Sequence, residues 1–172
     1  MFKENYKNIS SLFQKSFITH QCESTAKVVW PKGFGVYVVW ETSNDTNELI
    51  YIGLTGKFKK TQTGGYTINS GRFSNRKHRW TPYFFQESHV VGSEFVFRYG
   101  PKYTNNTMQL KNKYELDAYS KSINYSKLRV DFFLFSENVQ ENHGYTPSLL
   151  EAQLLTWYLI ENNSLPPANF EI

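Results

Sequence analysis

Two short runs of β-branched and aromatic residues constrain the fold of this chain more than any other feature. Residues 35–40 read GVYVVW and residues 49–53 read LIYIG, which is the composition of buried or half-buried strands. The segment between them, ETSNDTNE, is polar and rich in turn-forming residues. The sequence therefore predicts an antiparallel hairpin formed by these two strands.

Further periodic segments predict the elements around this hairpin. Residues 128–135 (LRVDFFLF) predict a third core strand, and residues 94–99 (EFVFRY) alternate in the manner of an inserted strand. The tripeptide Thr-Pro-Ser at 146–148 predicts the start of a helix, because a proline suits the first helical turn. We expect this helix to end near Asn162. Shorter helices are expected over about 6–17, from about 70, and over 108–120.

The pattern as a whole predicts an α+β fold in a single domain over residues 1–172. We expect a small, mainly antiparallel, three-stranded central sheet flanked by helices. Residues 1–30 form an N-terminal extension to this core, and residues from about 92 to 125 form an inserted strand and helix.

Positive charge is concentrated in one part of the chain. The formal net charge is +4, yet the segment 57–79 contains seven basic residues and no Asp or Glu. A surface that binds phosphates needs such a concentration of cations, so we expect a nucleic-acid partner. The predicted contacts are Lys57, Lys59, Lys60, Arg76, Lys77 and Arg79.

Cysteine content and hydropathy predict a soluble protein of the cytoplasm. The single cysteine, Cys22, excludes an intrachain disulfide and a four-cysteine zinc site. No apolar run approaches the ~20 residues needed to cross a bilayer, and the polar N-terminus is unlike a signal peptide. We therefore expect no association with membranes.

The two hairpin strands carry the tripeptides Gly35-Val36-Tyr37 and Tyr51-Ile52-Gly53. This pair resembles the signature of the GIY-YIG nuclease family, with Val36 in place of the usual isoleucine. Three further elements follow in the family's order, namely an arginine on the next helix, a glutamate on a helix after the third core strand, and an asparagine after a proline. In this chain they are Arg72, Glu151 and Asn169.

The resemblance implies a metal-dependent hydrolysis of phosphodiester bonds. Tyr51, supported by Tyr37, would act as the general base or relay to it, and Arg72 would hold the non-bridging phosphate oxygens. Glu151 would bind Mg²⁺, a cation that keeps most of its waters and needs only one protein carboxylate; Mn²⁺ is the expected substitute. Asn169 completes the implied site.

The segment after the arginine departs from the family's pattern. Family members often place a histidine or tyrosine one helical turn after the arginine, but Arg76 occupies that position and His78 lies further along. Either Arg76 takes over a phosphate contact and His78 approaches from the side, or the register of the helix differs from the one expected here. A further alternative is that Arg76 is itself the catalytic arginine in place of Arg72. A lysine near the second tripeptide is also expected, and Lys57, Lys59 and Lys60 are equal candidates.

The expected substrate is double-stranded DNA. The chain has no room for a separate DNA-reading domain, and its size and layout resemble the stand-alone Type II restriction endonucleases of this family, which often act as homodimers on DNA. One alternative is a structure-specific repair or recombination nuclease. The other is a non-catalytic DNA-binding module of the same fold, although such a binder should have lost one of the site residues.

Overall fold

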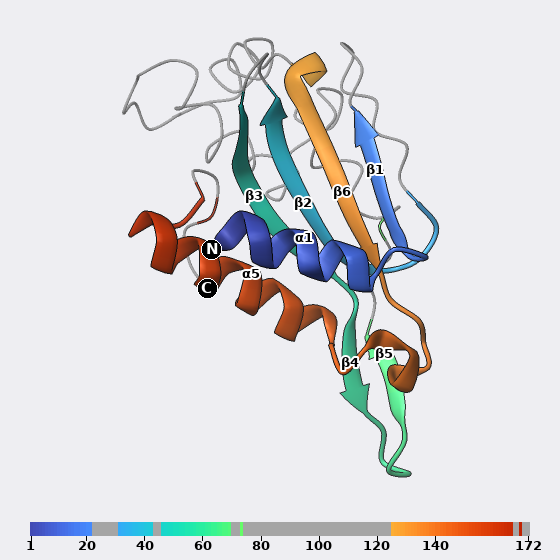
Figure 1. The fold of residues 1–172 in the computed structure, drawn as a ribbon. Coiled ribbons are helices and arrows are strands. Elements are labelled where there is room, and N and C mark those ends of the chain that lie inside the picture. Colours follow the sequence, from blue (N-terminus) through green and yellow to red (C-terminus); the bar gives the residue numbers. More distant parts are fainter. Residues whose placement is uncertain (22–30, 43–45, 70–72, 74–124, 167–168, 170–172) are drawn as a thin grey trace, which may run out of the picture.

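The computed structural model describes residues 1–21, 31–42, 46–69, 73, 125–166 and 169. Its centre is a four-stranded antiparallel sheet with the strand order β1-β6-β2-β3 (Figure 1). The strands are β1 (Phe17–Gln21), β2 (Gly35–Thr42), β3 (Asn47–Thr55) and β6 (Leu128–Leu134). The predicted α+β class, the hairpin and the third core strand are thus confirmed.

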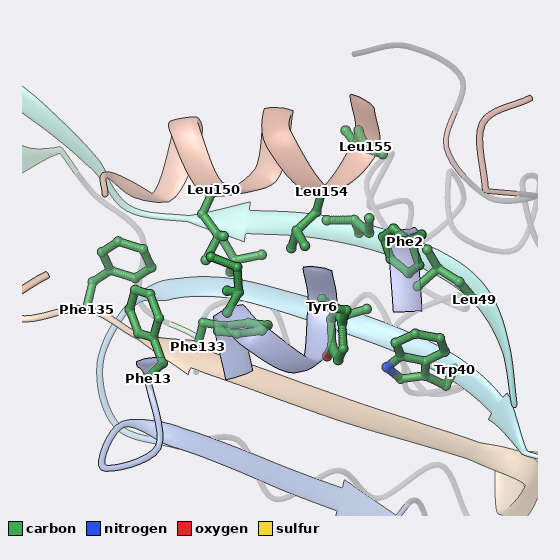
Figure 2. Close-up of a cluster of buried hydrophobic side chains, with 14 of the residues drawn as sticks. Phe2, Tyr6, Phe13, Trp40, Leu49, Phe133, Phe135, Leu150, Leu154 and Leu155 are labelled. Carbon is green, nitrogen blue, oxygen red and sulfur yellow. The ribbon is translucent and has the colours of Figure 1, made fainter. Parts of the chain in front are cut away.

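Two helices lie side by side on one face of this sheet (Figure 1). They are α1 (Phe2–Leu12) and α5 (Pro147–Asn162), and α5 packs against both β3 and β2. Figure 2 shows the core that they enclose, in which Leu150 and Leu154 of α5 meet aromatic side chains of α1 and the sheet. We call this side of the sheet the helix face.

The sequence fixes both ends of α5 through its caps. The Thr146 side chain accepts a hydrogen bond of 3.2 Å from the backbone N–H of Leu149, and Pro147 occupies the first turn, where no N–H is needed. At the other end Asn163 adopts a left-handed conformation with φ of 52°, and its N–H donates to Leu159 O. The predicted helix over 147–162 is therefore confirmed.

The N-terminal extension differs from the expectation in two ways. The helix expected over about 6–17 begins earlier and ends earlier, as α1 (Phe2–Leu12). The extension then adds β1 to the sheet, so the prediction of three central strands was wrong by one. Strand β1 reads FITHQ and is largely exposed at the edge of the sheet, so it lacks the alternation by which a strand is recognised.

A buried carboxylate holds this extension to the sheet. Asp131 on β6 is 1% exposed and accepts hydrogen bonds from Tyr6 Oη at 2.6 Å, Trp40 Nε1 at 2.8 Å and Thr19 Oγ1 at 2.9 Å. The Arg129 guanidinium lies 3.3 Å from the same carboxylate. Burial, followed by the charge of Asp131, raises the pKa of Tyr6 well above its usual value, so Tyr6 stays a donor.

A second, two-stranded sheet extends from the end of β3 (Figure 1). It consists of β4 (Lys57–Lys60) and β5 (Tyr66–Asn69), two strands that were not predicted from the sequence. Strand β4 reads KFKK and β5 reads YTIN, so neither shows a long hydrophobic pattern. Phe58 and Ile68 nonetheless pair across the hairpin and pack against the core, where the Phe58 and Phe34 rings meet edge to face at 5.8 Å.

Two short 3-10 helices, η2 (Tyr125–Lys127) and η3 (Val139–Asn142), flank β6 along the chain. The strand predicted at 94–99 and the helices predicted from about 70 and over 108–120 lie outside the described residues, apart from Phe73. In the part of the chain that the structure describes, no helix has the length and apolar character needed to span a membrane.

Candidate active site

The pairing of β2 with β3 places both motif tyrosines on one face of the sheet. Tyr37 lies opposite Gly53, and Val39 lies opposite Tyr51, so the two tyrosine side chains are diagonal neighbours. Their ring centroids are 5.8 Å apart, with an angle of 41° between the ring planes. This face, which we call the tyrosine face, is opposite the helix face, because Val36 and Val38 alternate with Tyr37 and belong to the helix-face core.

A register shift in β3 directs the Tyr51 side chain. Val39 pairs with Tyr51 and Trp40 pairs with Leu49, which leaves Ile50 as an extra residue in a β-bulge. Leu49 can therefore join Trp40 in the helix-face core while Tyr51 stays on the tyrosine face. Bulges often re-aim a side chain at a functional position, and here the bulge immediately precedes Tyr51.

Gly53 is the residue over which both tyrosines meet. A Cβ atom at this position would lie 2.5 Å from Tyr51 Cε1 and 2.8 Å from both Cζ and Oη of Tyr37. No side chain larger than hydrogen fits without displacing a ring. The glycine of the second tripeptide is thus explained by the close approach of the two phenols to the β3 backbone.

Gly35, the glycine of the first tripeptide, is required for a different reason. Its φ of +148° is unusual for residues with a side chain, and a Cβ atom there would lie 1.9 Å from the Phe133 carbonyl oxygen. The residue begins β2 where this strand meets both β3 and β6. Both motif glycines therefore serve the close packing of the hairpin on its neighbours.

The two tyrosines differ in their access to solvent. Tyr37 is fully buried, whereas Tyr51 is half-buried. Phe73, whose N–H donates to Gly33 O at 2.8 Å, packs edge to face against Tyr37 at 6.3 Å and against Phe132 at 5.1 Å. Tyr37 is thus an enclosed member of the cluster, and Tyr51 is the phenol that a substrate could approach.

Thr55 is a member of this face that the sequence analysis missed. It follows Tyr51 and Gly53 at the period of two along β3, so the three residues share a face. Its side chain is fully buried, and its hydroxyl has no hydrogen-bond partner among the residues that the structure describes. The alternation Tyr51, Gly53, Thr55 was the signal in the sequence that could have identified it.

Asn169 contacts the backbone of the motif strand. Its Nδ2 donates to Ile52 O at 2.8 Å, and its Oδ1 accepts from Ile52 N at 2.9 Å. Ile52 lies between Tyr51 and Gly53 on β3, the strand at the end of the sheet order. The amide therefore pairs with the strand as a neighbouring strand residue would, and it holds the backbone that carries Tyr51.

Glu151 lies on the helix side of the sheet, opposite the tyrosine face. It is the fifth residue of α5 and is half-buried, next to Leu150 of the helix-face core. Helix α5 packs on β3, the strand that carries Tyr51. Glu151 therefore lies on a helix that packs against one face of β2 and β3, and the Tyr37 and Tyr51 side chains lie on the opposite face of the same two strands.

Several predicted site residues lie outside the described residues, namely Arg72, Arg76, Lys77, His78 and Arg79. Arg72 immediately precedes Phe73 in the chain. Of the insertion predicted over about 92–125, only Tyr125 is described.

The donors around this site suit a hard cation held by few protein ligands. Within residues 1–21, 31–42, 46–69, 73, 125–166 and 169, no group of three or more His, Cys, Asp or Glu side chains could share a metal ion. A Mg²⁺ ion keeps most of its waters and needs one or two carboxylates, which Glu151 can supply alone.

The chain was compared with models of protein families, with curated proteins and with solved structures. No family model, curated protein or solved structure matched it. The assignment of the site therefore depends on its residues and their geometry alone.

Substitution of Gly53 tests whether the glycine is required by the two phenols. We expect Gly53→Ala to lower the free energy of unfolding by about 1–3 kcal/mol, because the added methyl group forces both rings to move. Gly65→Ala is the matched control, since a Cβ atom there meets only Thr61 Oγ1 at 3.4 Å. Urea unfolding and near-UV circular dichroism of the tyrosines measure the two effects; equal behaviour of the two variants would contradict the packing described here.

Proposed function

We propose that this chain is a divalent-metal-dependent endonuclease of the GIY-YIG type that hydrolyses duplex DNA. The observation that carries the proposal is the meeting of Tyr37 and Tyr51 over Gly53 on two paired strands. The two tripeptides that resemble the family signature are adjacent in space. Close packing explains why each of them contains a glycine. A chance pair of tripeptides would not be expected to converge in this way.

The chemistry requires a proton acceptor and a proton donor. A water oxygen forms a bond to phosphorus, the bond from phosphorus to one sugar oxygen breaks, the water gives up a proton, and the departing oxygen gains one. Tyr51 is half-buried and therefore the phenol that the attacking water can approach. In its deprotonated form it would accept the proton of that water, and in its protonated form it would relay the proton to another acceptor. Tyr37 is enclosed, and its ring holds the Tyr51 ring in position.

A guanidinium group holds the non-bridging oxygens of the phosphate in this proposal. Arg72 is the favoured residue, because it is bonded to Phe73, whose ring packs against Tyr37. A bidentate pair of N–H donors fits two phosphate oxygens and stabilises the charge that develops on them. Arg76, one helical turn further along the expected helix, is the alternative.

Glu151 is the proposed metal ligand. A bound Mg²⁺ or Mn²⁺ ion would polarise the phosphate and stabilise the charge on the leaving oxygen. Two observations support a role for Glu151, namely its half-burial and the packing of its helix on β3. Asn169 acts as a positioning residue, since its amide holds the backbone between Tyr51 and Gly53.

The biological role that fits best is that of a Type II restriction endonuclease acting as a homodimer on DNA. Its support is the resemblance of the residue layout over 35–169 to the stand-alone Type II restriction endonucleases of this family. Two copies related by a two-fold axis would place one site on each DNA strand. A structure-specific nuclease would catalyse the same hydrolysis but would not recognise a particular DNA sequence.

Digestion of phage-genome DNA distinguishes these roles. The purified protein is incubated with the DNA and Mg²⁺, and with EDTA in a parallel sample. We expect discrete bands with Mg²⁺ and intact DNA with EDTA; mapping of the fragment ends then gives the recognition sequence. A smear that also needs Mg²⁺ would leave the nuclease but remove the restriction role, and retardation of DNA in a gel without cleavage would favour a binding module.

A further inference from the structure

The β4–β5 hairpin carries an unusual density of exposed positive charge. Lys57, Lys59 and Lys60 make up three of the four residues of β4, and all three are exposed. The whole segment 57–69 contains no Asp or Glu. In the described part of the chain, none of these lysines forms an ion pair.

The two faces of the hairpin have different characters. Phe58 pairs with Ile68, and both pack on the core, so this inner face fixes the hairpin to the body of the protein. Alternation along β4 turns Lys57 and Lys59 to the opposite, outer face. The acid Glu137 lines a hollow of about 300 Å³ together with Phe58, Tyr66, Thr67 and Ile68.

The hairpin follows directly after β3, the strand that carries Tyr51. β3 ends at Thr55, and the single residue Gly56 leads into β4 with φ of +76°. A Cβ atom at Gly56 would lie 2.8 Å from Phe34 Cβ, so this corner is closely packed. Lys57 follows Tyr51 by six residues, which can span at most about 20 Å of chain. One turn of duplex DNA is about 34 Å long, so one duplex can contact both residues.

The tip of the hairpin is a defined turn. Thr61 N donates to Gly65 O at 2.8 Å, Gly64 N donates to Thr61 O at 3.1 Å, and the hydroxyls of Thr61 and Thr63 are 3.0 Å apart. The paired strands β4 and β5 are thus closed by a hydrogen-bonded turn. Figure 1 shows that it projects beyond the end of the four-stranded sheet.

From these features we infer that the outer face of the β4–β5 hairpin is a second DNA contact, in which Lys57 and Lys59 each bind a backbone phosphate of the duplex held at Tyr51. This inference rests on the proposed function. The two ammonium groups branch from positions about 7 Å apart on one strand face, which lets each bind a different phosphate. Because phosphate contacts carry no sequence information, the hairpin contributes affinity and register, and base selection lies elsewhere.

The salt dependence of DNA binding tests this contact. Binding of a labelled duplex is measured by fluorescence anisotropy over a range of salt concentrations in EDTA, where no cleavage occurs. Each lost phosphate contact makes the slope of log K against log salt less negative by about 0.9, so Lys57→Ala/Lys59→Ala is expected to change the slope by about 1.8 and to bind more weakly. Lys3→Ala/Lys7→Ala on the exposed side of α1 removes the same charge elsewhere, and its slope is expected to match that of the wild type.

The outcomes separate this inference from the proposed function, because cleavage of DNA by the wild type is scored independently. Suppose that the wild type cleaves DNA but the Lys57→Ala/Lys59→Ala variant has the same salt slope as the wild type or as the Lys3→Ala/Lys7→Ala variant. That result would overturn the hairpin contact and leave the nuclease proposal intact. A hairpin-dependent slope in a protein that cleaves no DNA would support the contact and count against the nuclease. Thermal unfolding of both double variants ensures that each is folded.

Discussion

The Tyr51→Phe variant is expected to cleave DNA about 10²–10⁴-fold more slowly than the wild type, while binding DNA with similar affinity. This range is the usual contribution of a positioned general acid or base. The substitution removes only the hydroxyl oxygen, and the half-buried ring can keep its contact with Tyr37. Initial rates of cleavage of a supercoiled plasmid with Mg²⁺ measure the effect.

Tyr145→Phe provides the matched control for this substitution. Tyr145 is a half-buried tyrosine that packs against the helix-face core and contacts the Phe13 ring at 6.2 Å. Its loss of a hydroxyl should leave the cleavage rate unchanged. Equal rates for Tyr51→Phe and the wild type would exclude Tyr51 from the proton transfer.

The Asp131→Ala variant is expected to lose about 3–5 kcal/mol of the free energy of unfolding, the effect of removing one partner from a buried charged pair. The carboxylate is 1% exposed and accepts from donors on α1, β1 and β2. Its removal leaves buried Tyr6 and Trp40 donors unsatisfied and Arg129 without its ion pair. A typical domain has only about 5–15 kcal/mol of stability, so the loss is severe.

Glu4→Ala is a suitable control, because Glu4 is an exposed acid on α1. Urea unfolding of both variants gives the free energies. A fall for Asp131→Ala no larger than that for Glu4→Ala would show that the buried network does not hold the N-terminal extension to the sheet. Hydrogen exchange at β1 amides would locate the damage, since Thr19 of β1 donates directly to Asp131.

The elements that could be predicted from the sequence are those whose own residues are sufficient to define them as a strand or a helix. The runs at 35–40 and 49–53 have the composition of buried strands, and Thr146 with Pro147 defines the start of α5. Strand β1 was not predictable in this way, since its residues are mostly polar and form a strand only by pairing with β6. The β4–β5 hairpin was missed for a similar reason, because it depends on two anchors, Phe58 and Ile68, in contact with a distant core.

The candidate site was predictable in its residue types but not in its geometry. The motif named Tyr37 and Tyr51, but their placement on one face depends on a register that the bulge at Ile50 helps to set. The bidentate hydrogen bonds from Asn169 to Ile52 join residues 117 positions apart, a pairing that no local pattern encodes. Thr55 was overlooked because a threonine in a strand is ordinary until its burial is known.

The most direct test of the central claim is the cleavage activity of Glu151→Gln compared with that of Glu161→Gln. Both glutamates lie on α5, so the two variants remove the same charge from the same helix. Each is incubated with supercoiled plasmid and increasing Mg²⁺, and binding of the duplex is measured in EDTA. We expect Glu151→Gln to bind DNA but to leave the plasmid intact at all Mg²⁺ concentrations, and Glu161→Gln to cut as the wild type does. Cleavage by Glu151→Gln at the wild-type rate would contradict the account of a metal-dependent nuclease site built across β3.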